Sequence, residues 1–260
     1  MGVCRALVTA ASRGIGFMAL EALSSLGCIT VSCSRSPDRM VEALREISRR
    51  YPESKVIPLE CDLRVKDSVF NVVAYALREL SGLDYVVINY GNPSREPLNL
   101  HEAEWEDWME ASALYIASTA TILKLLIERN PVKATTLIIS SFTTVEPMPP
   151  LIVSDTVRSG LSRLVRVAAR EYPSRIRPIL LLLGSFDTPG ARETIRRIAK
   201  SKNMDPEEVW KREVEGISPL RRVGRREELV ELIKMLLKTP EYLTGATILF
   251  DGATSRIAWP

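Results

Sequence analysis

The most informative stretch of the chain is Ala6-Leu7-Val8-Thr9-Ala10-Ala11-Ser12-Arg13-Gly14-Ile15-Gly16, which runs directly into an apolar-periodic segment from Phe17 to Leu26. An apolar strand, a turn of small residues with two glycines, and then a helix is the arrangement that points backbone N–H groups at a phosphate. The glycines keep side chains away from the pyrophosphate and let the helix approach the sheet. The stretch therefore predicts a dinucleotide site, although small residues also form ordinary strand-to-helix turns.

Length and composition are those of one α/β domain with a large core. The chain has 260 residues, 46% of them hydrophobic and 26% charged. Its 35 basic and 32 acidic residues give a net charge of +3, so nothing requires nucleic acid or an anionic membrane as a partner. No stretch reaches the ~18 uninterrupted apolar residues that span a bilayer. The first strand leaves no room for a signal peptide, so we expect a cytoplasmic protein. We expect neither nucleic acid nor a membrane as its partner.

The cysteines and the single histidine do not form a metal-binding pattern. Cys4, Cys28, Cys33 and Cys61 show no C-x-x-C spacing, and His101 stands alone, so we expect no metal site and buried free thiols. The chain has no glutamine and many arginines, lysines and glutamates, which is typical of proteins from thermophiles. In such an organism a disulfide between neighbouring strands is less improbable than in an ordinary cytosol.

Strand-like and helical segments alternate along the chain. Strands are expected at about 6–8, 28–33, 55–61, 83–89, 134–141, 176–183 and 246–250, and helices at about 17–26, 38–51, 65–80, 103–129, 153–171 and 227–238. This alternation predicts an α/β fold with a Rossmann-like, doubly wound parallel sheet. Residues 185–226 interrupt it with helical pieces at 191–202 and 206–215, and they are too many for an ordinary loop. We therefore expect a single domain, 1–260, with a helical substrate lid at about 185–226.

Several motifs stand at separations that are characteristic of one family. Thr9, Gly14 and Gly16 fit a T-G-x-x-x-G-x-G turn in which Ala10 replaces the first glycine. Matches to the later motifs are Cys61-Asp62-Leu63, Ile88-Asn89-Tyr90-Gly91, Ser140-Ser141, Leu183-Gly184 with Thr188, and Leu243-Thr244-Gly245 with Asp251-Gly252. With these motifs the chain resembles the short-chain dehydrogenase/reductases over nearly its whole length.

The resemblance implies a nicotinamide dinucleotide cofactor. The cofactor-binding positions that it implies are Thr9, Ser12, Arg13, Gly14, Ile15, Gly16, Ser34, Arg35, Asp62, Leu63, Asn89, Gly91, Arg158, Gly184 and Thr188. An NAD site has a carboxylate after the second strand, whereas the 2′-phosphate of NADP requires arginine. Here Ser34 and Arg35 follow that strand, and Arg13 lies in the glycine turn. This favours NADP over NAD, although either arginine alone would be read as a solvated surface charge.

The resemblance also implies the catalytic positions, and there the residues differ from the family pattern. Members of the family use a tyrosine as acid or base, a lysine four residues later, and a serine thirteen residues upstream. The helix pattern at 161–171 places Ser154 at the tyrosine position, Arg158 at the lysine position and Ser141 at the serine position. Ser141, Ser154 and Arg158 are therefore the catalytic candidates of an atypical member that lacks the Tyr-x-x-x-Lys pair.

These replacements remove the usual proton relay. Serine is a far weaker acid than a phenol with a pKa of about 10 beside an ammonium group. Arg158 could bind ribose and stabilise an oxyanion, but a guanidinium pKa of about 12.5 or above prevents it from transferring protons. Asp155, Tyr90 and Tyr115 are possible substitute acids, although a helix N-terminal carboxylate and two packing tyrosines are the simpler explanations.

Two further features have alternative interpretations. Trp105 and Trp108 are three residues apart on a helix and should pack against the core or a second subunit, since the resemblance implies a homodimer or homotetramer. Cations recur at helical spacing in the lid and either attract an anionic substrate or form a solvated face; they are Arg192, Arg196, Arg197 and Lys200.

The sequence as a whole favours an NADP-dependent oxidoreductase that moves hydride between nicotinamide and a small-molecule carbonyl or alcohol. The alternative is a catalytically inactive nucleotide-binding or scaffold protein with the same fold. Ala10, Ser154 and Arg158 favour the alternative, and the otherwise intact cofactor turn and lid favour the enzyme. The lid sequence does not reveal which carbonyl or alcohol is the substrate.

Overall fold

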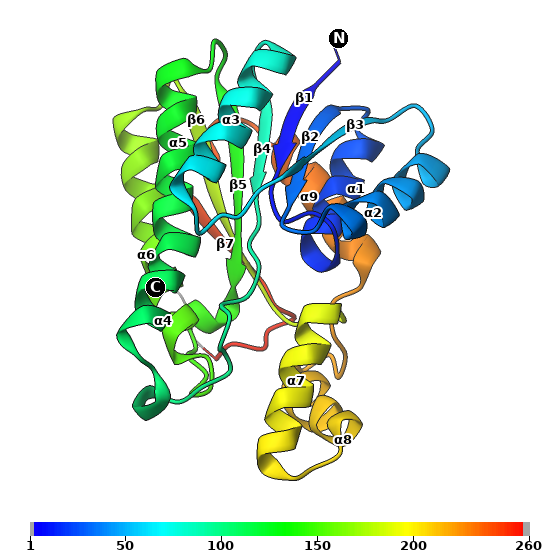
Figure 1. Ribbon diagram of the computed structural model, residues 1–260, viewed down its shortest axis with the longest axis vertical. Helices are drawn as coiled ribbons and strands as arrows, with labels where there is room; N and C mark the ends of the chain where they lie inside the picture. The colour runs from blue at the N-terminus through cyan, green and yellow to red at the C-terminus, as the bar shows by residue number, and fades with distance from the viewer. Residues whose placement is uncertain (1–2, 257–260) are drawn as a thin grey trace.

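A seven-stranded parallel sheet forms the centre of the computed structural model, which describes residues 3–256 (Figure 1). The strands lie in the order β3-β2-β1-β4-β5-β6-β7. Their bounds are β1 Arg5–Val8, β2 Ile29–Ser34, β3 Lys55–Glu60, β4 Tyr85–Ile88, β5 Ala134–Ser141, β6 Ile176–Leu183 and β7 Ala246–Phe250. The order reverses direction between β1 and β4, as in a doubly wound sheet, which confirms the predicted Rossmann-like fold.

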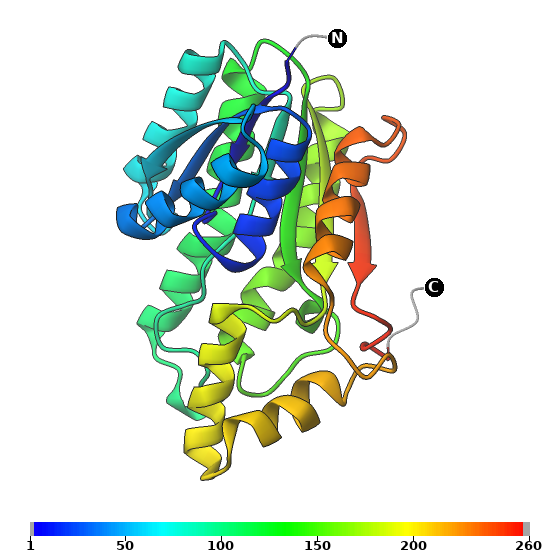
Figure 2. The ribbon, with the colours of Figure 1, turned by 90° about the vertical axis from the view of Figure 1, so that its right-hand side faces the viewer.

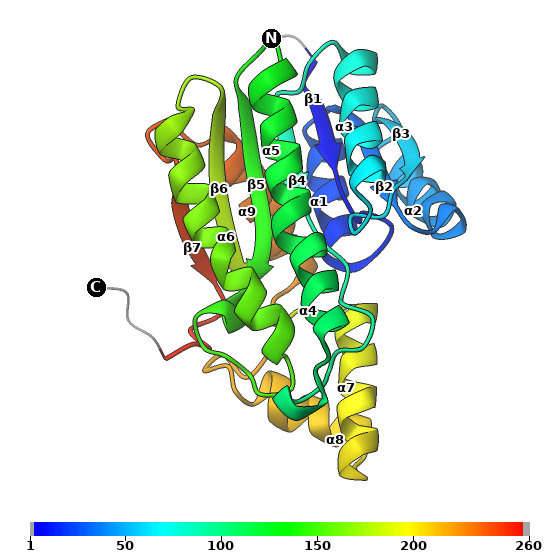
Figure 3. The ribbon, with the colours of Figure 1, turned by 60° about the vertical axis from the view of Figure 1, so that its left-hand side comes forward.

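Helices cover both faces of the sheet. One face carries α1 (Gly14–Ser25), α2 (Pro37–Arg50) and α9 (Arg226–Lys238). The other carries α3 (Lys66–Leu80), α4 (Trp105–Ala111), α5 (Ser118–Arg129) and α6 (Ile152–Glu171), which stand in front of the strands in Figure 3. Covering both faces explains why every residue of β6 is buried and why its sequence is almost wholly apolar.

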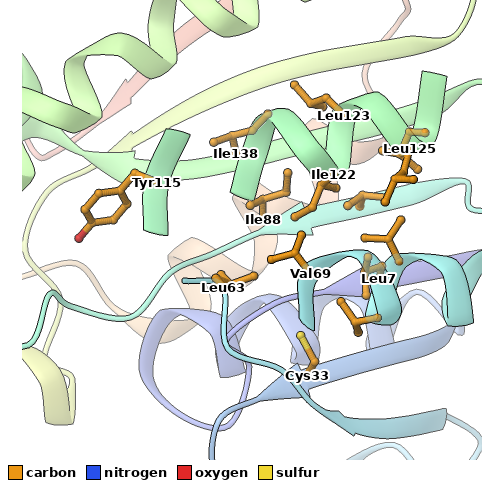
Figure 4. Close-up of a cluster of buried hydrophobic side chains, with 14 of the residues drawn as sticks. Leu7, Cys33, Leu63, Val69, Ile88, Tyr115, Ile122, Leu123, Leu125 and Ile138 are labelled. Atoms are coloured by element: carbon orange, nitrogen blue, oxygen red, sulfur yellow. The ribbon is translucent and has the colours of Figure 1, made fainter. Parts of the chain in front are cut away.

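The larger hydrophobic core fills the space between the sheet and α3 and α5. Figure 4 shows Leu7, Ile88 and Ile138 from the strands meeting Val69 and Ile122 from these helices. This cluster ends at a tyrosine, position 115, whose hydroxyl points away from the aliphatic side chains. The core therefore stops where a polar region begins, near the carboxyl ends of the strands.

The long helix after β4 is continuous but contains one wide turn. Between α4 and α5 the segment Ser112–Ala117 is π-helical, a feature that is frequent at functional sites. The whole helix, Trp105–Arg129, is long and apolar enough to cross a membrane by length and composition, yet half of its most apolar window is buried in this fold. Trp108 packs against the core, whereas Trp105 is 73% exposed. Packing of Trp105 against the core is therefore wrong, because its side of α4 faces away from the sheet.

The predicted lid consists of α7 (Pro189–Lys202), α8 (Pro206–Trp210) and a π-helical segment, Lys211–Glu215. Figure 2 shows these helices beyond the carboxyl ends of the strands. They enclose their own small hydrophobic cluster, which contains Ile198 and Trp210. The lid is thus held together by apolar contacts of its own.

Both ends of the lid contact α1. At its start, Thr188 packs on Gly14, since a Cβ added to that glycine would lie 3.3 Å from the Thr188 Cβ. At its end, Arg226 of α9 donates to the buried Glu21 carboxylate at 2.6 Å and lies over the Phe17 ring at 4.9 Å. The helix that follows the glycine turn therefore anchors both connections of the lid to the domain.

Two of the cysteines form a disulfide, which corrects the expectation of four free thiols. Cys4 and Cys28 are joined, with their Cα atoms 4.5 Å apart, while Cys33 and Cys61 are buried free thiols. The register of β1 and β2 explains the pairing, because the next residues along, Arg5 and Ile29, are direct partners in the sheet. The two cysteines therefore face each other just before their strands begin.

Candidate dinucleotide and catalytic site

A cavity of about 590 Å³ lies between the carboxyl ends of the strands and the lid. All but two of the predicted site residues line it. The exceptions, Thr9 and Gly16, lie beneath its surface and shape the glycine turn. Residues as far apart in the sequence as Ala10 and Ile217 are brought together here because the reversal of strand order opens a crevice at this edge of the sheet.

The threonine of the turn ties β1 to β4. The Thr9 hydroxyl donates to the Asn89 carbonyl at 2.7 Å and accepts from the Asn89 N–H at 3.0 Å. The Asn89 side-chain Nδ2 in turn donates to the Ala10 carbonyl at 3.2 Å. These three hydrogen bonds hold the turn after β1 against the end of β4, where a dinucleotide would cross the sheet.

The turn needs residues without bulky side chains, and this is visible in its geometry. A Cβ on Gly16 would lie 2.1 Å from the Ala10 carbonyl oxygen, so no other residue fits there. Gly14 has a φ of 58°, in the region that favours glycine. Ala10 has a φ of 50°, so alanine adopts the left-handed backbone of the glycine that it replaces. The turn therefore keeps its shape despite Ala10.

Three arginines without ion-pair partners mark one end of the cavity. Among residues 3–256, Arg13, Arg35 and Arg39 take part in no salt bridge, and all three line the cavity beside Ser34. Burial and the nearby Arg39 and Arg35 lower the pKa of Arg13. Neighbouring cations that repel one another form a favourable site for a phosphate. Arg39 was missed by the sequence analysis, although its position four residues after Arg35, near a helix start, was a usable signal.

Asp62 is held as an anion by a neighbour. Arg64 donates to its carboxylate from Nε at 2.9 Å, and also donates to Glu110 at 2.8 Å. The hydrogen bonds from Arg64 to Asp62 lower the pKa of the Asp62 carboxyl group. The turn after β3 is thereby fixed to α4, and Asp62 and Leu63 face the cavity from a rigid segment.

The three catalytic candidates gather at the other end of the cavity. Ser141 ends β5, and its Oγ accepts from the Thr143 N–H at 3.2 Å and lies 3.0 Å from the Thr143 Oγ1. Ser154 and Arg158 lie one turn apart on α6, and the Arg158 Nη2 donates to the Ser154 Oγ at 2.9 Å. The arrangement places two hydroxyls and one guanidinium on the wall of the cavity.

Asp155 orients this group from outside the cavity. Its carboxylate accepts from the Thr143 hydroxyl, from the Met148 N–H at 3.0 Å and from Arg158 at 3.2 Å. Burial raises its pKa, but all of these partners favour the charged form. Asp155 does not line the cavity, so the structure makes it a support for Arg158 rather than an acid that contacts a ligand.

The two tyrosines are poor acids in this environment. Tyr90 and Tyr115 form an edge-to-face pair with ring centroids 5.1 Å apart, and the Tyr90 hydroxyl bonds to Thr119. Burial raises the pKa of Tyr90 and raises that of Tyr115 to about 12. Both line the cavity, where they provide an aromatic wall.

Glu96 is a cavity residue that the sequence analysis missed. It lies in the loop after β4, is 7% exposed, and accepts the Ser154 N–H at 2.7 Å through Oε1. Burial raises the pKa of its carboxyl group. No motif contains this glutamate, and its contact spans 58 residues of sequence, so the signal was absent before the fold was known.

The lid cations are mostly paired with acids on the lid itself. Arg192 bonds to Asp187 at 2.8 Å and lies over the Trp210 ring at 3.7 Å. Arg196 and Arg197 pair with a glutamate one turn earlier. These pairs fit the interpretation of the lid cations as a solvated helix face better than the interpretation as a patch that attracts an anionic substrate.

The cavity fits a dinucleotide in shape and chemistry. Its glycine turn has no room for a side chain at Gly16, and its cationic end is lined by Arg13, Arg35 and Arg39. At its floor, the Ser140 Oγ is buried without a hydrogen-bond partner among the described residues. Within residues 3–256, no group of three histidine, cysteine or acidic side chains could hold a metal ion.

Comparisons with known proteins agree with this geometry. Residues 9–254 match the family model described as enoyl-(acyl carrier protein) reductase. The chain is 26% identical to glucose 1-dehydrogenase of Gluconobacter oxydans over 253 residues, which is 95% of this chain and 90% of that protein.

Solved structures share the fold. The L-sorbose reductase of Gluconobacter frateurii, complexed with NADPH and L-sorbose, superposes with a TM-score of 0.87 at 21% identity and covers 99% of both chains. An NADPH-bound short-chain oxidoreductase of Pseudomonas aeruginosa PAO1 with an atypical catalytic center has a TM-score of 0.83 at 24% identity and covers 98% of both chains. With the family model matched over almost the whole chain, the protein belongs to the enoyl-(acyl carrier protein) reductase family of short-chain dehydrogenase/reductases.

Proposed function

We propose that the protein is an NADP-dependent oxidoreductase that transfers hydride between nicotinamide and a small-molecule carbonyl or alcohol. The observation that carries the proposal is one cavity with a phosphate-binding glycine turn and unpaired arginines at one end and an oxygen-binding group at the other. Relatives that are dehydrogenases and reductases, and structural neighbours that hold NADPH, support it.

The cationic end selects the phosphorylated cofactor. Arg13 and Arg35, with Arg39 beside them, would hold the 2′-phosphate, and no acid stands after β2 to favour a free ribose hydroxyl. The N-terminus of α1 would hold the pyrophosphate. When bound, the dinucleotide supplies or accepts the hydride.

The other end polarises the substrate oxygen. The Ser141 and Ser154 hydroxyls donate to this oxygen, and Arg158 stabilises the negative charge that develops on it. Arg158 keeps its orientation because Asp155 holds it at 3.2 Å. Ser154 and Arg158 thus take the places of the tyrosine and lysine that the family uses, which makes this an atypical member.

Binding of the two reduced cofactors tests the first half of the proposal. NADPH and NADH are titrated into the protein and into Arg35→Ala, with Arg49→Ala as the matched control because it removes the same charge at the far, exposed end of α2. We expect NADPH to bind more tightly than NADH. Loss of a charge-assisted hydrogen bond worth about 1.5–3 kcal/mol should weaken NADPH binding roughly tenfold or more in Arg35→Ala. Equal affinities for both cofactors would refute NADP selectivity.

Turnover tests the second half. NADPH oxidation is followed with a panel of ketones and aldehydes, including L-sorbose, and NADP⁺ reduction with a panel of alcohols and sugars, including glucose. Tight NADPH binding without turnover of any carbonyl would favour the alternative function, a nucleotide-binding protein without catalysis. The departure from the family pattern at Ser154 and Arg158 is the observation that keeps this alternative open.

A further inference from the structure

Four carboxylates line the cavity, and three of them are engaged by cations. Asp62 pairs with Arg64, and on the lid Glu193 and Glu213 each pair with two neighbouring cations. Glu96 is the fourth, and within residues 3–256 it forms no salt bridge. It is also the only one of the four that is buried. A buried carboxyl group without an ion pair tends to keep its proton.

Glu96 contacts the backbone of Ser154, whose hydroxyl is one of the catalytic candidates of the cavity. Its Oε1 accepts the Ser154 N–H at 2.7 Å, and among residues 3–256 this is the one hydrogen bond that its carboxyl group accepts. The Ser154 Oγ accepts from Arg158 at 2.9 Å, and its own donation to the Leu151 carbonyl is long, at 3.4 Å. The hydroxyl is therefore weakly held as a donor and can turn toward a ligand oxygen.

Ionisable side chains surround Glu96 from three elements. Arg158 and Asp155 face it from α6, and Tyr115 faces it from the π-helical segment. From the lid, the Arg197 Nη1 donates to the Glu96 backbone carbonyl at 3.1 Å. Burial is the largest influence on the pKa of Glu96 and raises it, against the opposing effects of Ser154 and Arg158.

The loop that carries Glu96 is fixed in place. The Leu98 N–H donates to the Pro150 carbonyl at 2.9 Å, which joins this loop to the segment leading into α6. The position of Glu96 relative to Ser154 is therefore a property of the fold and not of a freely moving loop.

We propose that Glu96 is the acid that replaces the missing tyrosine, and that its proton reaches the substrate oxygen through the Ser154 hydroxyl. In carbonyl reduction the hydride adds to the carbonyl carbon, and the electron pair of the broken C=O π bond takes the proton of Ser154. Ser154 Oγ takes the carboxyl proton of Glu96, which is left as a carboxylate and regains a proton from solvent. Alcohol oxidation runs through the same steps in reverse. This inference rests on the proposed oxidoreductase function.

Kinetics of Glu96→Gln test the role of this proton. Glutamine keeps the acceptor for the Ser154 N–H but cannot supply a carboxyl proton, and Glu106→Gln, an exposed position on α4, is the control. General acid catalysis contributes about 10²–10⁴-fold, so we expect Glu96→Gln to slow carbonyl reduction at least roughly a hundredfold. The Kd for NADPH should stay within twofold, and Glu96→Asp should recover part of the rate.

The pH profile separates an acid from a merely structural residue. Wild-type reduction should be constant at low pH and fall as pH rises through the pKa of Glu96, whereas oxidation should rise over the same interval. The step should be absent in Glu96→Gln. If Glu96→Gln reduces carbonyls at the wild-type rate and with the wild-type pH profile, the role of Glu96 is overturned and the proposed function is not. Absence of wild-type turnover with every carbonyl would instead overturn the proposed function, and the inference with it.

A spectroscopic measurement does not depend on activity. The infrared difference between wild type and Glu96→Gln isolates the carboxyl band of this one residue, without nucleotide or substrate. We expect the protonated band to persist to a pH above the ordinary glutamate pKa of about 4.3. A band that disappears at or below that value would overturn the inference.

Discussion

Replacing Ala10 with glycine should stabilise the protein and tighten nucleotide binding at the same time. Ala10 has a φ of 50° and its side chain lines the cavity where the pyrophosphate is proposed to bind. The left-handed backbone costs an L-residue about 1–2 kcal/mol that glycine does not incur. Glycine loses about 0.4–1 kcal/mol more conformational entropy on folding, so the net gain should be near 0.5–1 kcal/mol. In a chain of this size that gain raises Tm by roughly 1–3 °C.

A matched substitution separates the conformational gain from the effect on the cavity. Ala253 has a φ of 60°, is exposed, and lies outside this cavity. Ala253→Gly should therefore raise Tm by a similar amount and leave the Kd for NADPH unchanged. Ala10→Gly should lower that Kd about fivefold if the methyl group costs about 1 kcal/mol in binding.

Thermal unfolding and NADPH titration of both variants check the reasoning. The shape of the turn should not change, because the Asn89 side chain holds the Ala10 carbonyl and Gly16 packs against it. A lower Tm in both variants would show that unfolded-state entropy outweighs the left-handed strain. A weaker affinity in Ala10→Gly would show that the methyl group contacts the nucleotide favourably, which would contradict the role given to glycine in this turn.

Three further predictions follow from other parts of the fold. In the Glu96→Gln background, combining Ser154→Tyr with Arg158→Lys should recover carbonyl reduction at least roughly tenfold, because a phenol beside an ammonium group can supply the proton, and single-turnover rates measure it. Cys4→Ser opens a disulfide between residues 24 apart in sequence, so the free energy of unfolding should fall by about 3 kcal/mol in denaturant titrations. If the exposed Trp105 contributes to a subunit contact, as expected for a homodimer or homotetramer, Trp105→Ser should lower the mass observed by light scattering, and an unchanged mass would exclude that contact.

The alternation of strands and helices could be read from the sequence because each element has its own period. Even the boundaries agree: the strand expected at 134–141 is β5, Ala134–Ser141, and the strand expected at 176–183 is β6, Ile176–Leu183. β6 is an almost wholly apolar run, β5 mixes apolar residues with threonine and serine, and nearly every residue of both strands is buried. Local sequence patterns were therefore enough to predict the bounds of a strand that is buried along its whole length.

The features that could not be read depend on how distant segments align. Cys4 and Cys28 became partners only once the register of β1 and β2 was known, and sequence spacing contains no register. Glu96 and Ser154 meet because a loop after β4 is joined to the segment before α6. Asp155 was recognised as a helix-start acid, but its burial and its hold on Arg158 are tertiary properties.

The attachment of both lid connections to α1 has a consequence for nucleotide binding. Thr188 at the start and Arg226 beyond the end contact the helix whose N-terminus is the proposed pyrophosphate site. If nucleotide binding at that N-terminus shifts the lid toward one position, then that lid position tightens nucleotide binding by the same factor, because coupling between two equilibria is reciprocal. We therefore expect nucleotide binding to favour one position of the lid, and a substrate that favours the same position to tighten nucleotide binding by the same factor.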